Sequence, residues 1–202
     1  MVKSKEDYMK RLFYYIKSKF LTFFGDIKYF KFPFFLVYDP DEYLIDGEKT
    51  RDIMRKIKTG DLILRRYRHY LDGVFIPGKY SHTGIYIGNG KVIHAVSEGV
   101  CKIDLLDFVR CDGICILRPK EGQEEAVQTA RECCIKGIPY DFDFKEGTKA
   151  LYCHELGAVC YKNLNIEKKI PKLFGGLIKS KIPRWLAESF LTSPDFKIVE
   201  EY

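Results

Sequence analysis

The fold is decided by residues 81–95, which read SHTGIYIGNGKVIHA. Two runs rich in β-branched and aromatic residues flank the dipeptide Asn89-Gly90. Both positions of this dipeptide tolerate positive φ, as a two-residue hairpin turn requires. The stretch therefore predicts two antiparallel strands, 81–88 and 91–97, joined by a tight turn.

Working outward from this hairpin, the pattern predicts further elements on both sides. Apolar Leu62-Ile63-Leu64 indicates a strand over 61–66, and a similar run indicates another over 113–117. Helical spacing of apolar residues, with Gly137 and Pro139 ending one segment, predicts helices over 5–24, 48–58, 122–136 and 152–162, and short helical pieces near 173–178 and 184–191. Helix, then antiparallel strands, then helices is an α+β order: a small antiparallel sheet or partly open barrel packed with helices.

Length and composition suit one folded domain with an appendage. The chain has 202 residues, 46% hydrophobic and 31% charged, so it can bury a sizeable core. We expect an N-terminal amphipathic, basic and aromatic helical extension over 1–45 and a catalytic domain over 46–202. The net charge of +6 is too mild to demand an anionic partner, and no nucleic acid is expected.

Cysteine usage predicts a reducing compartment. The seven cysteines are an odd number without a CxxC pair, and no secretion signal precedes them. No stretch of about 18 uncharged apolar residues is present, so no membrane-spanning helix is predicted. The expected location is the cytoplasm, with peripheral membrane association left open.

That alternative comes from the N-terminal segment. Residues 5–24 place apolar side chains at spacings of three and four with lysines and an arginine between them, and aromatic residues continue through 29–35. Such a helix either packs on the following domain or makes a peripheral membrane contact through residues 5–36. The sequence leaves both interpretations open.

Two of the four histidines lie on the predicted hairpin. Reflection across a two-residue turn brings His82 opposite position 97, so His94 is about three positions out of register. A regular hairpin would not bring the two rings together. Diagonal contact, a bulge or a wider turn is needed.

Cys153 stands in the first turn of the helix predicted over 152–162. Free N–H groups and the positive end of the helix dipole favour an anion there, which predicts a lowered thiol pKa and a place for an oxyanion. A nearby imidazole would complete a Cys–His pair, oriented by a second polar group. The competing interpretation is that Cys153 is a small buried residue. Its spacing from the histidines does not match a zinc site, so we expect no metal and no cofactor.

These segments together resemble a known family. The strings GDLI (60–63), SHTGIYIG (81–88), VIHA (92–95) and YCHEL (152–156) are similar to the circularly permuted branch of the NlpC-type papain-like superfamily. They resemble most the YiiX/YaeF-like permuted papain-like amidases, which include a poxvirus relative, and more distantly the lecithin retinol acyltransferase-like enzymes. The resemblance spans about 58–160 and implies the permuted papain-like fold.

The resemblance also implies roles for individual residues. Cys153 falls on the nucleophile, His82 on the base and His94 on the group that orients the base. YiiX-like members often carry a carboxylate at the third place, so Glu98 is an alternative orienting residue. Tyr140, Tyr152 and Glu155 fall near the expected substrate-binding positions.

Three functions follow as hypotheses. The first is a cysteine-nucleophile amidase or peptidase that works through an acyl-enzyme with a Cys-His-His triad. The second uses the same acyl-enzyme on lipid esters or thioesters at a membrane surface, as a thioesterase or acyltransferase. The third is a binding module that keeps the fold without turnover. The partner in the first two is an amide- or ester-containing substrate, a peptide or a lipid.

Overall fold

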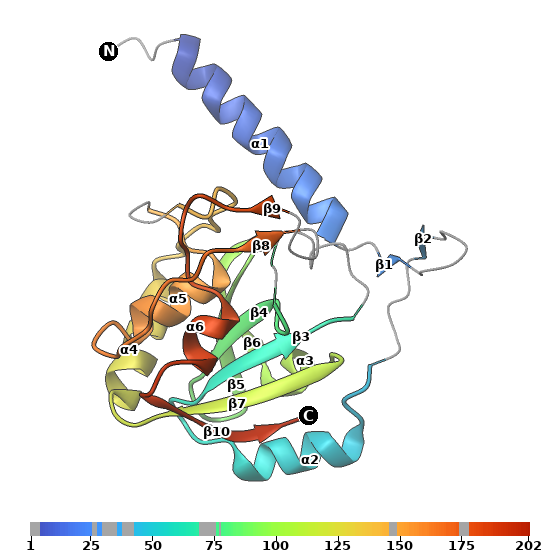
Figure 1. The fold of residues 1–202 in the computed structure, drawn as a ribbon, viewed down its shortest axis with the longest axis vertical. Helices are drawn as coiled ribbons and strands as arrows, with labels where there is room; N and C mark the ends of the chain where they lie inside the picture. Colours follow the sequence, from blue (N-terminus) through green and yellow to red (C-terminus); the bar gives the residue numbers. More distant parts are fainter. Residues whose placement is uncertain are drawn as a thin grey trace.

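An open, six-stranded antiparallel sheet forms the centre of the molecule (Figure 1). The computed structural model describes residues 5–25, 28–29, 36–37, 43–68, 76, 78–145, 149–173 and 178–202. In spatial order the strands are β10 (Phe196–Glu201), β7 (Gly113–Pro119), β3 (Leu62–Arg66), β4 (His82–Tyr86), β5 (Lys91–Val96) and β6 (Gly99–Asp104).

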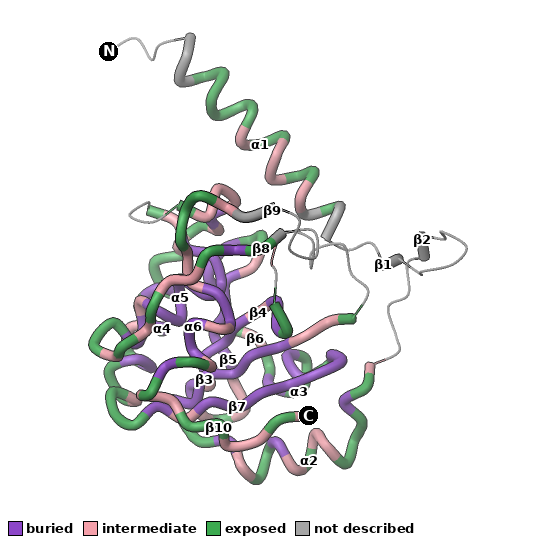
Figure 2. Tube along the Cα trace, viewed as in Figure 1, coloured by how far each residue is buried: buried purple, intermediate pink, exposed green. Residues whose placement is uncertain are grey.

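Helices cover both faces of this sheet, because its central strands are apolar on both sides (Figure 2). Leu62, Leu64 and Ile85 face a core formed with α4 (Gln123–Ile135), α5 (Cys153–Cys160) and α6 (Ala187–Leu191). Ile63 and Val92 face a second core formed with α2 (Gly47–Lys56) and α3 (Leu105–Phe108). The expected α+β plan is confirmed.

The hairpin between β4 and β5 has a wider turn than the predicted one. Gly84 pairs with His94 and Tyr86 with Val92, so the loop holds three residues, Gly88, Asn89 and Gly90. All three have positive φ, between 52° and 84°. The extra residue changes the offset between His82 and His94 from an odd to an even number, which places both side chains on one face of the sheet.

Three further elements differ from the sequence prediction. Strands β6 and β10 were not predicted, although both belong to the sheet. The helical piece predicted near 173–178 is wrong, because β8 (Lys172–Leu173) and β9 (Ile178–Lys179) pair as antiparallel strands. The residues between them lie outside the described part of the chain.

Outside this domain lies α1 (Lys5–Gly25), which projects from it (Figure 1). A small two-stranded pair, β1 (Lys28–Tyr29) and β2 (Leu36–Val37), follows. Large apolar side chains along α1 are exposed, including Phe13 at 72% and Phe23 at 68%. None of the described helices is both long and apolar enough to cross a membrane.

Candidate active site

The two hairpin histidines form a hydrogen-bonded pair. His82 Nε2 lies 3.0 Å from His94 Nδ1, and the rings meet edge to face. They reach each other diagonally, since His94 pairs in register with Gly84, two residues from His82. The lack of a side chain at Gly84 also makes room below them, where a Cβ would lie 2.7 Å from the ring of Phe108.

A buried arginine shares this surface and was not anticipated from the sequence. Arg65 pairs with His82 across the β3–β4 ladder, so both side chains point to the same face. Its guanidinium stacks over Phe108 at 4.6 Å, and the same ring contacts both histidines. The available signal was the alternation in β3, where Arg65 follows Ile63 on the inward face.

These surroundings keep both histidines neutral. Desolvation, and then the positive charge of Arg65, lower the pKa of His94 to about 3. The same two causes hold the pKa of His82 well below its usual value. A neutral His82 has one ring nitrogen bonded to His94 and the other available to accept a proton.

Cys153 begins α5 and lies against the first residues of β4. Its thiol donates to the Ser81 carbonyl at 3.8 Å, and Ser81 directly precedes His82. The side chain is 1% exposed and lines a narrow cleft. The other residues that line this cleft are Ile76, Phe144, Tyr152, His154, Arg184, Trp185 and Leu186.

The expected depression of the Cys153 pKa is wrong for the buried thiol of this structure. Burial raises the pKa of the thiol to about 12. Backbone N–H groups of Thr83 and His154 and the charge of Arg65 act in the opposite direction, but desolvation outweighs them. Cys153 therefore rests as a neutral thiol, and the two hairpin histidines rest as neutral imidazoles.

The remaining candidates occupy different places. Tyr152 lines the cleft, and its buried hydroxyl accepts the Trp185 N–H at 2.9 Å. Tyr140 does not line this cleft, although its ring contacts that of Phe144, which does. Glu155 is 3% exposed in the first turn of α5.

Two neighbours of these residues do not join the histidine pair. Glu98 is exposed in the turn before β6, where its carboxylate accepts from Ser97, so it does not take the place of His94. His154 points to the other face of the sheet, where its Nδ1 lies 2.5 Å from Thr83 Oγ1.

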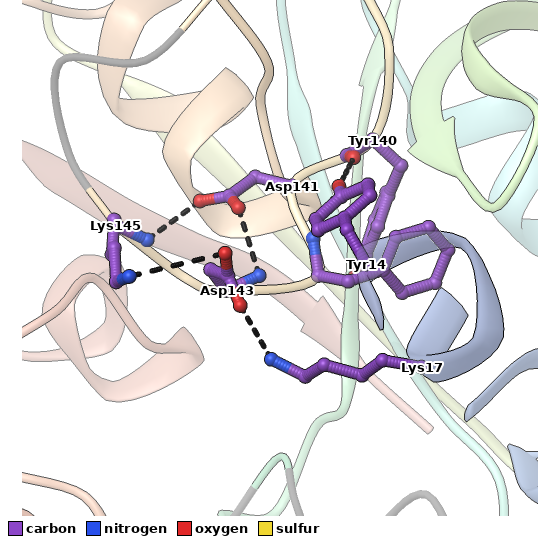
Figure 3. Close-up of polar contacts among 7 residues, drawn as sticks. Tyr14, Lys17, Tyr140, Asp141, Asp143 and Lys145 are labelled. Atoms are coloured by element: carbon purple, nitrogen blue, oxygen red, sulfur yellow. Dashed lines mark hydrogen bonds and ion pairs between the residues drawn. The ribbon is translucent and has the colours of Figure 1, made fainter. Parts of the chain in front are cut away.

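A short segment beside the cleft carries the contact with α1 (Figure 3). Tyr14 donates to the Tyr140 carbonyl at 2.8 Å, and Lys17 pairs with Asp143 at 2.5 Å. Asp141 holds the same segment from within by accepting the N–H groups of Asp143 and Lys145. This segment, residues 140–145, thus connects α1 to Phe144 in the cleft wall.

Comparison with known proteins assigns the chain to a family. The family described as permuted papain-like amidase enzyme, YaeF/YiiX, C92 family, matches residues 56–200. The chain belongs to this permuted papain-like amidase family. At family level it is therefore a hydrolase of the papain-like class.

Two members or neighbours of the family illustrate the range of similarity. Protein OPG091 of Vaccinia virus (strain Copenhagen) is 30% identical over 126 residues, which is 57% of this chain and 72% of that protein. The crystal structure of metalloprotein yiiX from Escherichia coli O157:H7 matches with a TM-score of 0.59 and 22% identity, over 73% of this chain and 98% of that one. This second likeness confirms the fold.

The name of the Escherichia coli protein raises the question of a metal. Within the described part of this chain, no three His, Cys, Asp or Glu side chains gather as a metal site would require. The two hairpin histidines instead bond to each other.

Proposed function

We propose that this chain is a thiol amidase or peptidase that forms an acyl-enzyme on Cys153. The observation that carries the proposal is the 3.0 Å hydrogen bond between His82 and His94. His82 directly follows Ser81, whose carbonyl accepts the Cys153 thiol. A nucleophile, a base and a group that orients the base are the parts that such a reaction needs.

The proton has a defined route in this proposal. His94 is neutral, and when its Nδ1 accepts the His82 Nε2–H, the Nδ1 of His82 keeps its lone pair. That nitrogen takes the thiol proton as sulfur bonds to the carbonyl carbon, then passes it to the leaving amine as the amide C–N bond breaks. In the second half it takes a proton from water, which attacks the thioester and releases sulfur as thiol.

The start of α5 supplies the electrostatic part. Backbone N–H groups in the first turn of a helix have no intrahelical partner, and those of Cys153 and His154 already favour a negative sulfur. The same groups would stabilise the oxyanion that forms on the attacked carbonyl. Because both residues are neutral at rest, we assign proton transfer to the moment of attack rather than to a preformed ion pair.

Substrate contacts and domain limits complete the proposal. Tyr152 would contact the substrate directly from the cleft wall. Tyr140 would act through Phe144, and Glu155 would support the first turn of α5 as an acid near its N-terminus. We place the catalytic domain at 46–202 and treat 1–45 as its extension.

Trapping of the acyl-enzyme tests this function. A panel of amide, ester and thioester substrates is incubated with the full chain, and intact mass and peptide mapping locate the added acyl group. We expect acylation of Cys153, its loss in Cys153→Ala, and its persistence in the matched control Cys160→Ala on the same helix. Acylation that survives Cys153→Ala would end the proposal, and a folded protein that no substrate acylates would favour the non-catalytic binding module.

A lipid-directed function is the second candidate, and exposed apolar residues of α1 favour it. Phe13, Ile16, Phe20 and Phe23 are each more than half exposed, with Lys10 and Lys19 also exposed. A basic helix of this kind can lie in a membrane interface. Flotation with anionic liposomes compares the full chain with one that lacks residues 1–36. Binding by the full chain alone supports a peripheral membrane contact, and equal behaviour of the two removes this candidate.

A further inference from the structure

A second pocket opens next to the cleft that contains Cys153. Arg66, Tyr67, Arg68, Ile76, Gly78, Lys79 and Ser81 line it. Ile76 also lines the Cys153 cleft, and the Ser81 carbonyl accepts the Cys153 thiol at 3.8 Å. A molecule that reaches Cys153 can therefore extend into this second pocket.

Among the described residues that line this pocket, three have cationic side chains and none has a carboxylate. Lys79 is compensated, since its ammonium pairs with Glu201 at 2.5 Å. The side chains of Arg66 and Arg68 form no ion pair with any residue that the structure describes. The Asp112 carboxylate accepts a hydrogen bond from the backbone N–H of Arg68, at 2.6 Å, and not from its guanidinium. The charge of Arg66 is partly compensated at longer range, since it helps Lys79 to lower the pKa of Glu201. The Arg68 guanidinium has no ion-pair partner among the described residues.

Buried polar atoms at the same pocket also lack partners. Ser81 is 7% exposed, and its hydroxyl finds no hydrogen-bond partner among the described residues. The same holds for Nε of Arg66. The Oε1 of Glu188 accepts the backbone N–H of Lys79, and its Oε2 is also buried without a partner, so this carboxylate satisfies neither group. Buried donors of this kind indicate a missing acceptor, because unpaired buried polar groups are costly.

We propose that this pocket binds an anionic group of the substrate, a phosphate or a carboxylate, while the reacting carbonyl lies at Cys153. Guanidinium groups suit this task, since their planar N–H pairs match the oxygens of both anions. The Ser81 hydroxyl would donate a further hydrogen bond. This inference rests on the proposed function only for the place of the carbonyl, and it narrows the substrate to anionic amides or esters.

Matched electrophiles test the proposal. Three bromoacetamides share one reactive carbon and differ at the end of a two-carbon linker, which carries a hydroxyl, a carboxylate or a phosphate. The Cys153 sulfur displaces bromide, so a C–S bond forms as the C–Br bond breaks. Each rate constant is divided by that of the same probe with free cysteine. We expect at least one anionic probe to be favoured over the hydroxyl probe by about tenfold, in line with a charge-assisted contact.

Variants and their outcomes separate this inference from the proposed function. Arg66→Gln/Arg68→Gln should reduce the preference to within about twofold, while Arg51→Gln/Arg55→Gln, the same loss of charge on the exposed surface of α2, should keep it. Preference for the phosphate or for the carboxylate probe identifies which anion the pocket takes. If Cys153 reacts with all three probes at the same normalised rate, the proposal of an anion-binding pocket is overturned, while the proposed role of Cys153 as nucleophile still stands.

If Cys153 reacts with none of the probes, that result counts against the proposed function, and a second measurement then tests anion binding independently of Cys153 reactivity. Inorganic phosphate and acetate are titrated separately into Cys153→Ser, and the amide chemical shifts of residues 66–68 and 78–81 are followed. Saturable shifts with either anion that vanish in the background of Arg66→Gln/Arg68→Gln support the pocket on its own. Shifts that saturate with neither anion would overturn it.

Discussion

Arg65 adds to desolvation in setting the protonation of the histidines around it. The residue is 9% exposed, its side chain faces the same side as His82, and its guanidinium stacks on the Phe108 ring that contacts both histidines. A fixed positive charge in this position disfavours a second one on the imidazoles and favours a negative charge on Cys153.

Replacement of Arg65 should move the pH profile of the site. In Arg65→Met the pKa values of His82 and His94 rise toward their usual value, because the cause second to desolvation is removed from both. In a plot of the rate of Cys153 alkylation against pH, the rate falls on the acidic side (the acidic limb). In Arg65→Met this limb should lie about one pH unit higher. Arg65→Lys, which keeps the charge, is the control. Identical limbs in the wild type and Arg65→Met, at equal thermal stability, would contradict this role.

Among the elements, the β4–β5 hairpin shows what sequence reasoning could and could not supply. Its two strands, and the helices over α2, α4 and α5, follow from apolar periodicity and turn residues. The three-residue loop does not, because Gly88 is also compatible with a strand end. The offset between His82 and His94 is odd with a two-residue loop and even with a three-residue loop, and only the strand register shows which loop is present. The sequence therefore predicted the pair, and the loop geometry brings it together.

Other parts of the site depend on long-range packing. Burial of Cys153, which raises its pKa, results from residues far along the chain such as Ile76 and Trp185. A local argument from the helix dipole could not include this desolvation. Strand β10 was missed for a similar reason: its side chains alternate poorly, and its place in the sheet comes from pairing with β7.

Gly84 is the position where the hairpin is most sensitive. A Cβ there would lie 2.6 Å from Val92 and 2.7 Å from Phe108, and both side chains are fully buried. Gly84→Ala should lower the free energy of unfolding by about 1–3 kcal/mol through overpacking, measured by urea denaturation. It should also slow acylation of Cys153, because Phe108 supports both histidines. Gly47→Ala is the control, since its φ lies outside the left-handed region and a Cβ there meets only the end of the Arg51 side chain, at 3.6 Å.

The contact with α1 should restrain the motion of residues 140–145. Tyr14→Phe removes hydrogen bonds to the Tyr140 carbonyl and the Phe142 N–H. Amide hydrogen exchange in residues 140–145 should become several-fold faster, because fewer contacts oppose local opening. Tyr15→Phe, at an exposed position one residue away, should leave the exchange unchanged. Equal exchange in both variants would mean that α1 does not hold this segment.

For the whole molecule, the buried histidines predict acid sensitivity. The pKa values of His94 and His154 are lowered to about 3 from 6.5, chiefly by desolvation. The unfolded chain binds these protons near pH 6.5 and the folded chain only near pH 3. Stability from both groups is therefore complete above pH 6.5 and is lost as the pH falls through that window.

The size of this loss can be measured. At pH 5 the folded state should be less stable than at pH 7 by about 2 kcal/mol for each of the two histidines. Thermal unfolding at both pH values tests this. His154→Asn should remove about 2 kcal/mol of the difference, and His94 and His82, whose pKa values are also lowered, account for the rest. An unfolding temperature that does not change between pH 7 and pH 5 would show that these histidines are not buried as neutral groups.

The central claim is that His82 activates Cys153. The most direct measurement is the rate of iodoacetamide alkylation of Cys153 at pH 7, followed by peptide mass, in the wild type and in His82→Gln. General-base assistance predicts that the wild type reacts on the order of 100-fold faster. Equal rates in the two proteins, with Cys153 no more reactive than free cysteine, would contradict it.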